Sequence, residues 1–136
     1  MIIAHKGVAH PWQCDVMGHM TTRYYVAMFD DASYHLLHEV FGWTAGDEQL
    51  GWADVKHIIE YQDEVGSGDL LEVRGRLERI GGKSITVSYT MHNLSRKSLA
   101  ATLESTSVYF DLKARRAVRV PDQLRERASR FLGAAN

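Results

Sequence analysis

The hydrophobic period of this chain changes once, and that change limits the folds that the sequence can adopt. Between Tyr24 and Val40 apolar side chains recur every three or four residues, which is typical of one face of an α-helix. The face consists of Tyr25, Met28, Phe29, Ala32, Leu36 and Val40. From Leu71 onward apolar and polar residues alternate, as they do in strands with one buried face. The sequence therefore predicts one long helix followed by an antiparallel sheet.

Turn signals divide the region after the helix into four predicted strands. The stretch Gly66-Ser67-Gly68-Asp69 closes the first of them, and Gly81-Gly82 is typical of a hairpin turn between the next two. Asn93 to Lys97 supplies the turn before the last strand, which is rich in Thr, Val, Tyr and Phe. The four predicted strands are Val55–Glu64, Leu71–Glu78, Ile85–His92 and Leu99–Asp111.

The two ends of the chain complete an α+β arrangement. Met1 to Gln13 is expected to form a first strand, and Asp122 to Leu132 a short helix, since Pro121 favours a helix start. Thr21 or Thr22 can cap the long helix, and Gly42 can end it. The predicted fold is a five-stranded antiparallel sheet curved around one long central helix, with a short C-terminal helix, as a single domain spanning residues 1–136.

The long helix and the sheet edges predict further contacts. Because the helix is apolar on more than one side, we expect other structure to wrap most of it. Sheet edges in such a unit invite pairing with another chain. A homodimer with a continuous sheet, or a homotetramer built from two such dimers, is expected.

Composition and charge exclude several classes of protein. The 136 residues suit one domain with a real core, and the net charge of −1 creates no global field that would attract nucleic acid or a membrane. The single cysteine, Cys14, excludes an intramolecular disulfide bond. No apolar run approaches the ~20 residues needed to span a bilayer, and the N-terminus lacks the apolar core of a secretory signal. We therefore expect a cytoplasmic protein.

Three segments, taken in order, carry a resemblance to a known family. Asp15-Val16-Met17-Gly18-His19-Met20 before the aromatic helix resembles an Asp-x-x-Gly-His-Met signature. Gly68-Asp69-Leu70, Val73 and Gly81-Gly82-Lys83-Ser84 lie at the family's hairpin positions. Phe110-Asp111-Leu112, leading to Arg116, Val120-Pro121 and Leu124, is similar to its last strand exit and terminal helix. Nearly the whole chain thus resembles the hotdog fold, and specifically the 4-hydroxybenzoyl-CoA thioesterase family of acyl-CoA thioesterases.

This resemblance implies thioester hydrolysis with Asp15 as the catalytic carboxylate. Asp15 could act as general base for water or attack the carbonyl carbon directly, and the sequence leaves both routes open. The family pattern assigns the oxyanion donor to the backbone N–H of Thr22, with Gly18 allowing close backbone approach before it. Close relatives often have Asn-Asn where this chain has Thr21-Thr22, a departure that affects acyl-group binding more than the reaction class, since the donor is main chain. His19 is a candidate general acid or a residue that orients Asp15, with a structural histidine as the alternative.

Other residues are candidates for binding the substrate. Lys83 and Ser84 lie at the hairpin where the family commonly contacts coenzyme A, and a lysine charge with a serine hydroxyl suits its phosphates. A solvated turn lysine is the alternative interpretation. His57 and Tyr61 share one face of their predicted strand, and Tyr25 lies on the apolar face of the helix. These three side chains could line an acyl pocket, with core packing as the alternative.

No metal and no cofactor is expected, coenzyme A being part of the substrate. His35, His38 and Glu39 have helical spacing, but no downstream residue completes a recognisable ligand set.

Two other functions remain open on the sequence. Gly18-His19 resembles the Gly-His of acyl-carrier-protein dehydratases, hotdog enzymes that carry an acidic residue where this chain has Ser33 and a Phe-Pro run that is absent here. A non-catalytic acyl-CoA or acyl-carrier-protein binding module would not need Asp15. The sequence determines neither the acyl group nor whether coenzyme A or acyl-carrier protein bears it.

Overall fold

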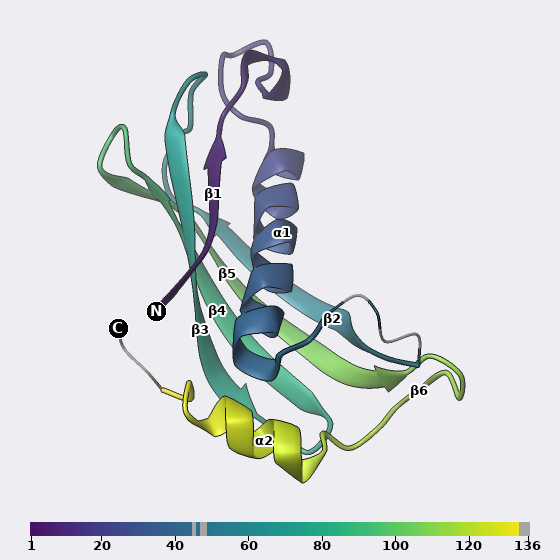
Figure 1. Ribbon diagram of the computed structural model, residues 1–136. Coiled ribbons are helices and arrows are strands. Elements are labelled where there is room, and N and C mark those ends of the chain that lie inside the picture. Colours follow the sequence, from purple (N-terminus) through teal and green to yellow (C-terminus); the bar gives the residue numbers. More distant parts are fainter. Residues whose placement is uncertain (45, 47–48, 134–136) are drawn as a thin grey trace.

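A computed structural model describes residues 1–44, 46 and 49–133. One long helix, α1 (Thr22–Phe41), lies across one face of an antiparallel sheet, and the short helix α2 (Asp122–Ser129) lies near the C-terminal end of α1 (Figure 1). The strand order is β1-β3-β4-β5-β2, with β6 paired to β5. The strands are β1 (Ile2–Val8), β2 (Leu50–Tyr61), β3 (Leu70–Ile80), β4 (Ser84–Asn93), β5 (Ser98–Asp111) and β6 (Arg116–Ala117).

The helix and the hairpin-connected strands that the hydrophobic period predicts are confirmed, and the differences lie at the ends of elements. The sheet has six strands instead of five, because Arg116–Ala117 pairs with the end of β5 and is too short to show a period. The first strand ends at Val8, and a 3-10 turn at Pro11–Gln13 follows, since proline fixes φ and lacks an N–H for the sheet. β2 begins at Leu50, five residues before the predicted start.

The core lies between α1 and the sheet. Every residue of the predicted apolar helix face is buried, and Phe29, Ala32, Leu36 and Val40 are almost fully so. The facing strands contribute the alternating residues of the predicted inner face, among them Val73, Leu77, Ile85, Val87, Tyr89 and Met91. The apolar face of the helix and the inner face of the strands thus pack together in one layer.

The expectation that other structure wraps most of α1 is wrong for this chain by itself. Within the part of the chain that the structure describes, the sheet covers one side of the helix, and Tyr34 on another side is 55% exposed. The neighbouring edge strand β2 also carries exposed apolar side chains, with Val55 60% exposed and Ile58 and Tyr61 nearly as open. Apolar side chains along an unpaired edge favour contact with another chain.

Gly42 ends α1, and Arg127 of α2 binds the last carbonyls of the helix. Gly42 has a φ of +69° and its N–H donates to the His38 carbonyl at 2.8 Å, so it ends the helix as predicted. Arg127 of α2 donates from Nε to the Val40 carbonyl at 3.2 Å and from Nη2 to the Glu39 carbonyl at 3.4 Å. These bonds supply partners for carbonyls that a helix end leaves without them. A Cβ on Gly42 would lie 3.0 Å from Arg127 Nη1.

We expect Gly42→Ala to lower the free energy of unfolding by about 1–2 kcal/mol, because a Cβ is disfavoured in this left-handed conformation. Urea unfolding followed by circular dichroism measures the change. Gly82→Ala is the matched control, since an added Cβ there meets nothing within 4 Å. Equal losses in the two variants would contradict the assignment of strain to Gly42.

Candidate functional site

Asp15 to His19 form a tight loop immediately before α1. The Gly18 N–H donates to the Asp15 carbonyl at 3.0 Å, and the Asp15 N–H donates to the His19 carbonyl at 2.9 Å. Gly18 has a φ of +81°, a conformation that glycine adopts without a steric cost. Asp15 Oδ1 accepts the N–H of Met17 at 2.9 Å and of His19 at 3.3 Å. One carboxylate oxygen therefore holds the loop, while Oδ2 accepts no hydrogen bond from the described residues.

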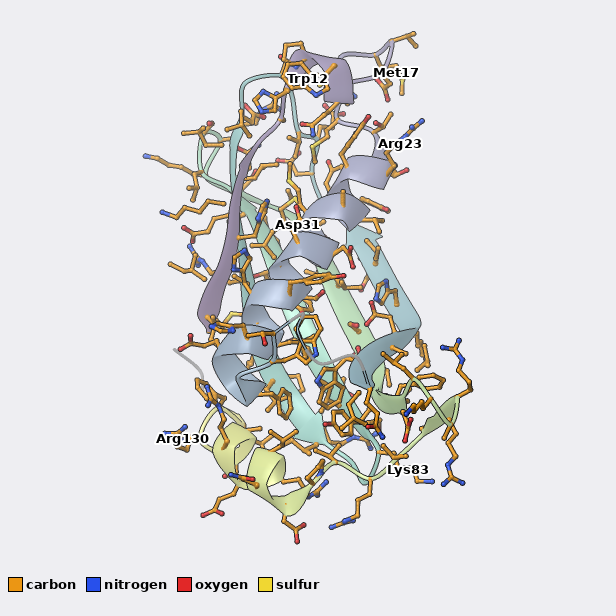
Figure 2. All side chains as sticks on the ribbon, turned by 45° about the vertical axis from the view of Figure 1, so that its right-hand side comes forward. Trp12, Met17, Arg23, Asp31, Lys83 and Arg130 are labelled. Atoms are coloured by element: carbon orange, nitrogen blue, oxygen red, sulfur yellow. The ribbon has the colours of Figure 1, made fainter. Side chains whose placement is uncertain are left out.

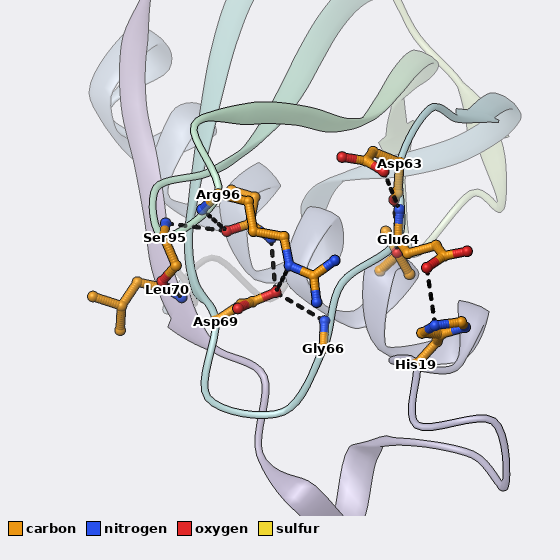
Figure 3. Close-up of polar contacts among 10 residues, drawn as sticks. His19, Asp63, Glu64, Gly66, Asp69, Leu70, Ser95 and Arg96 are labelled. Carbon is orange, nitrogen blue, oxygen red and sulfur yellow. Dashed lines mark hydrogen bonds and ion pairs between the residues drawn. The ribbon is translucent and has the colours of Figure 1, made fainter.

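The loop is tied to the segment that follows β2. His19 pairs with Gly66 in a β-bridge, and the Met20 N–H donates to the Val65 carbonyl at 2.7 Å. His19 Nε2 lies 2.9 Å from Glu64 Oε2, as Figure 3 shows. The main-chain N–H of His19 contacts Asp15, whereas its ring faces Glu64, a residue that the sequence analysis missed.

An open groove runs past the N-terminal end of α1. Four of the predicted site residues meet in it, namely His19, Thr22, Tyr25 and Tyr61. The rings of Tyr25 and Tyr61 pack edge to face with centroids 5.1 Å apart, and the Tyr25 hydroxyl donates to the Asp63 carbonyl at 3.4 Å. The complete lining is His19, Met20, Thr22, Tyr25, Tyr61, Gln62, Asp63 and Glu64. The groove thus combines two aromatic rings with polar groups at a helix start.

The helix start offers main-chain donors to this groove. Thr21 occupies the N-cap position, but its hydroxyl donates to the Gln13 carbonyl at 3.0 Å and makes no capping bond to the helix. Thr22 is the first residue of α1, and the first N–H groups of a helix have no acceptor within it. They also carry the partial positive charge of the helix dipole. An oxygen that gains negative charge in the groove would therefore be stabilised there.

Acidic neighbours and burial set the state of Tyr25. Burial, followed by the negative charges of Tyr61, Asp63 and Glu64, raises the pKa of Tyr25, and this outweighs the lowering effect of a backbone hydrogen bond at Val65. Its hydroxyl therefore stays protonated at neutral pH and acts as a hydrogen-bond donor.

The other predicted site residues lie outside the groove within one chain. Lys83 and Ser84 lie at the β3–β4 hairpin, and Figure 2 shows Lys83 at the opposite end of the molecule from Met17 and Arg23. His57 lies on β2, where its Nε2 is 3.6 Å from Asp54 Oδ2. Asp15 and Gly18 belong to the loop beside the groove and do not line it.

A second hollow lies between α1 and β2 and carries two acidic residues that the sequence analysis did not single out. Asp30 of α1 and Asp54 of β2 line it, and the Ser107 hydroxyl donates to Asp54 Oδ1 at 2.6 Å. Burial, followed by the charges of Asp54 and Asp31, raises the pKa of Asp30 against the opposing effect of His57. The aromatic residues Tyr34, Trp43 and Trp52 also line it.

Ser33 lies in the same hollow, at the position where the dehydratases have their acidic residue. Its hydroxyl donates to the Asp30 carbonyl at 2.6 Å. A neutral hydroxyl does not replace an acid in proton transfer at neutral pH, so the position gives no support to dehydratase chemistry.

Two further properties bear on the class of site. Among residues 1–44, 46 and 49–133, no three or more His, Cys, Asp and Glu side chains are grouped so as to hold a metal ion. Neither helix in the same part of the chain has the length and hydropathy that a membrane-spanning helix needs.

Comparison with known proteins identifies the family. The sequence profile of the thioesterase-like superfamily matches residues 9–128. The chain belongs to this superfamily. No curated protein sequence matches it.

Solved structures show the same fold as this thioesterase-like chain. PA5185 of Pseudomonas aeruginosa is 20% identical with a TM-score of 0.83, the alignment covering 98% of this chain and 95% of that one. YbaW of Escherichia coli, named a probable thioesterase, is 22% identical with a TM-score of 0.81 and coverage of 96% and 98%. SAV2348 of Staphylococcus aureus, solved in complex with CoA, is 16% identical with a TM-score of 0.83 and coverage of 100% and 90%. At these identities the likeness establishes the fold, which is the hotdog-like thioesterase fold.

Proposed function

We propose that the protein is an acyl-CoA thioesterase of the 4-hydroxybenzoyl-CoA thioesterase type, which hydrolyses an acyl-CoA thioester to the free acid and coenzyme A. One observation carries this proposal: the loop of Asp15 leads directly to a helix start whose first residue, Thr22, lines a groove. Membership of the thioesterase-like superfamily supports the reaction class. The complex of SAV2348 with CoA supports a coenzyme A ligand.

In this mechanism the thioester carbonyl lies at the start of α1, and its oxygen accepts a hydrogen bond from the Thr22 N–H. As a general base, Asp15 removes a proton from water while the water oxygen attacks the carbonyl carbon, and the carbon–sulfur bond then breaks as coenzyme A leaves. As a nucleophile, an Asp15 carboxylate oxygen would attack the carbonyl carbon and expel the coenzyme A thiolate, giving an anhydride that water cleaves to the free acid and the Asp15 carboxylate. In either route the helix start stabilises the developing oxyanion, and losing one such donor in another hydrolase costs about 10²–10³ in rate.

The remaining groove residues provide binding surface in this proposal. Tyr25 and Tyr61 pack against the acyl group with their rings, which are fixed by their edge-to-face contact. His19, with its ring on Glu64, supplies a polar group beside the carbonyl. Gly18 keeps the loop tight enough for Asp15 and Thr22 to serve one carbonyl.

A second copy of the chain would bring Lys83 and Ser84 to the groove. β2 is an edge strand with the groove at its Tyr61 end, and Ser84 lies toward its other end, since both Ser84 and Ala53 pair with Val108. Two-fold pairing of β2 with β2 of a second copy is antiparallel, so each groove would face the far end of the other chain. Lys83 and Ser84 of that copy would then contact the phosphates of coenzyme A, and His57, midway along β2, would lie near the two-fold axis.

Sedimentation velocity tests the assembly. A chain of 15.4 kDa should sediment at twice or four times this mass. Ser84→Ala and Lys83→Ala should raise KM for the acyl-CoA without changing the sedimenting mass. A monomer that binds coenzyme A with full affinity would contradict the shared site.

A panel of acyl-CoA thioesters tests the function itself. Aromatic, short aliphatic and polar acyl groups are compared by release of free thiol, with a protein-only blank because Cys14 can react with the reagent. We expect turnover of at least one acyl class, and the same acyl group on acyl-carrier protein shows which carrier is preferred. A folded protein that releases thiol from none of these thioesters would contradict the proposal.

A further inference from the structure

A single carboxylate oxygen gathers donors from two loops beside the groove. Asp69 Oδ2 accepts the Gly66 N–H at 2.9 Å and the Asn93 Nδ2 amide at 2.9 Å, and it lies 3.0 Å from Arg96 Nε (Figure 3). The Asp69 side chain is 13% exposed and Asn93 is 1% exposed. We call Gly66, Asp69, Asn93 and Arg96 the Asp69 clasp. The Arg96 side chain is 45% exposed, so the costly loss falls on the buried Asn93 amide, which would lose its charged acceptor.

The clasp joins two loops that are far apart in the sequence. Gly66 and Asp69 belong to the turn before β3, whereas Asn93 ends β4 and Arg96 belongs to the turn between β4 and β5. Asn93 Oδ1 also accepts the N–H of Ser95 at 3.1 Å and of Arg96 at 3.0 Å, so the second turn is held in a fixed shape. The Asp69 carboxylate therefore bonds the two turns to each other, in addition to the Leu94 N–H that donates to the Leu70 carbonyl at 2.8 Å.

The same turn holds the chain that enters α1. Gly66 pairs with His19, and its neighbour Val65, which is fully buried, accepts the Met20 N–H at 2.7 Å. Glu64, one residue earlier, lies against the His19 ring at 2.9 Å. Thr22 follows two residues after Met20 and begins the helix. Glu64–Gly66 thus contacts His19 and Met20 directly, and Gly66 itself donates to the Asp69 carboxylate of the clasp.

The space around Gly66 supports this chain of contacts. An added Cβ on Gly66 would lie 2.7 Å from Arg96 Nη2, so the guanidinium packs directly over the glycine. A side chain at position 66 would require the Nη2 end of the Arg96 guanidinium to shift. The clasp and the segment paired with His19 are therefore one packed unit.

We propose that the Asp69 clasp positions the His19–Thr22 segment and, through it, the reacting end of the groove. Asp69, Asn93 and Arg96 are positioning residues, since none of them lines the groove. The inference rests on the proposed thioesterase function, to which it adds residues that act from outside the site. A displacement of the order of 1 Å at a reacting group can cost about 10²-fold in rate, so a clasp of this kind affects turnover without touching the substrate.

The charge of Asp69 also predicts a pH dependence of stability. Burial would raise the pKa of Asp69, but the hydrogen bonds from Gly66 and Asn93 and the Arg96 charge outweigh it and hold the pKa below its ordinary value. A carboxyl with a lowered folded-state pKa stabilises the fold above its unfolded value near ~4, and this contribution is lost as the pH falls through the folded value. We expect the free energy of unfolding to fall less steeply below about pH 4 in Asp69→Asn than in the wild type. The free energy of unfolding is measured by urea unfolding between about pH 2.5 and about pH 5. Equal pH slopes in the variant and the wild type would contradict this expectation.

Asp69→Asn and Arg96→Lys test the positioning role. The first keeps the shape and removes the charge, and the second keeps the charge but loses the guanidinium fork. The matched control is Asp111→Asn, at the end of β5, where Oδ1 accepts the N–H of Lys113 and of Ala114, both at 2.9 Å, in the turn that follows. Steady-state kinetics use the acyl-CoA that the panel identifies, and amide hydrogen exchange is measured at Met20.

We expect Asp69→Asn to lower kcat about 10- to 100-fold with KM within about twofold, because the segment is displaced while the groove's binding surface remains. Met20 exchange should accelerate at least about tenfold, since its bond to Val65 opens more often. Arg96→Lys should also lower kcat and accelerate Met20 exchange, but by less. If Asp69→Asn does not fold, Arg96→Lys tests the positioning role by itself. Asp111→Asn should leave both readouts at wild-type values.

The proposal would be overturned if folded clasp variants kept the wild-type kcat and the wild-type Met20 exchange rate. It would also be overturned if Asp111→Asn lowered kcat and accelerated Met20 exchange as much as Asp69→Asn does. If the wild type hydrolyses no thioester, the proposed function fails by itself, and Met20 exchange still decides whether the clasp positions the segment.

Discussion

Replacing Asp15 by Asn is expected to lower kcat/KM for thioester hydrolysis about 10²–10⁴-fold while the fold is retained. The loop needs an oxygen that accepts the N–H of Met17 and His19, which Asp15 Oδ1 provides. The amide oxygen of Asn can accept the same two bonds. What Asn lacks is the negative charge that either removes a proton from water or attacks the carbonyl carbon. The substitution therefore separates the two roles that one carboxylate has in this loop.

The measurement compares kcat/KM of Asp15→Asn with that of Asp122→Asn on the best acyl-CoA of the panel. Asp122 is a suitable control because its side chain is 91% exposed at the start of α2 and, among the described residues, pairs only with Arg119, at 3.4 Å. Far-UV circular dichroism and the urea midpoint establish that both variants are folded. If a folded Asp15→Asn retains wild-type activity, the carboxylate is only a turn residue, and the binding-module alternative becomes the better account of the chain.

The fold was largely predictable because its signals are local. The helix face of Tyr25, Phe29 and Leu36 and the alternation in β3 and β4 each follow from the period of one element, and the buried residues are those that the period selects. β6 was missed because two residues show no period, and its pairing depends on the turn that precedes it. The wrapping of α1 was overestimated because apolar side chains such as Tyr34 are exposed in this chain, which the sequence does not distinguish from burial.

The candidate site was predictable only in part, because its neighbours come from different elements. Thr22 and Tyr25 are close in sequence, and the structure brings them together with Tyr61 in one groove. Glu64 could not be found, since it reaches His19 only through the bridge between His19 and Gly66. Residue spacing gives no measure of such non-local pairing. The distance between the groove and Lys83 likewise follows from the strand order, and a contact between them requires a second chain.

The second large effect is expected at Gly75 of β3, where the Leu36 side chain of α1 occupies the space that a Cβ would need. Gly75 lies on β3, and an added Cβ would overlap Leu36 Cδ1 and lie 3.1 Å from Tyr89 Cε1. Leu36 and Tyr89 are both buried, so neither can move aside without displacing other core residues. Glycine is otherwise a weak strand former, and alanine stabilises at unstrained positions by about 0.4–1 kcal/mol. At Gly75 the added methyl group has no space, so alanine destabilises the fold here. We expect Gly75→Ala to lower the free energy of unfolding by about 1–3 kcal/mol.

Denaturant unfolding of a double-mutant cycle identifies the cause. Leu36→Ala alone should cost about 2–5 kcal/mol, because it leaves a cavity in the core. In that background the Gly75→Ala methyl group enters vacated space, so the double variant should be more stable than the sum of the single losses predicts by about 1 kcal/mol or more. Gly51→Ala on the edge strand β2, where an added Cβ meets nothing within 4 Å, should cause no loss. Strictly additive losses at Gly75 and Leu36 would show that the two positions are not in steric conflict. The close approach of α1 to β3 would then need another cause. With a favourable coupling, the absence of a side chain at Gly75 is what leaves room for Leu36 of α1 against β3.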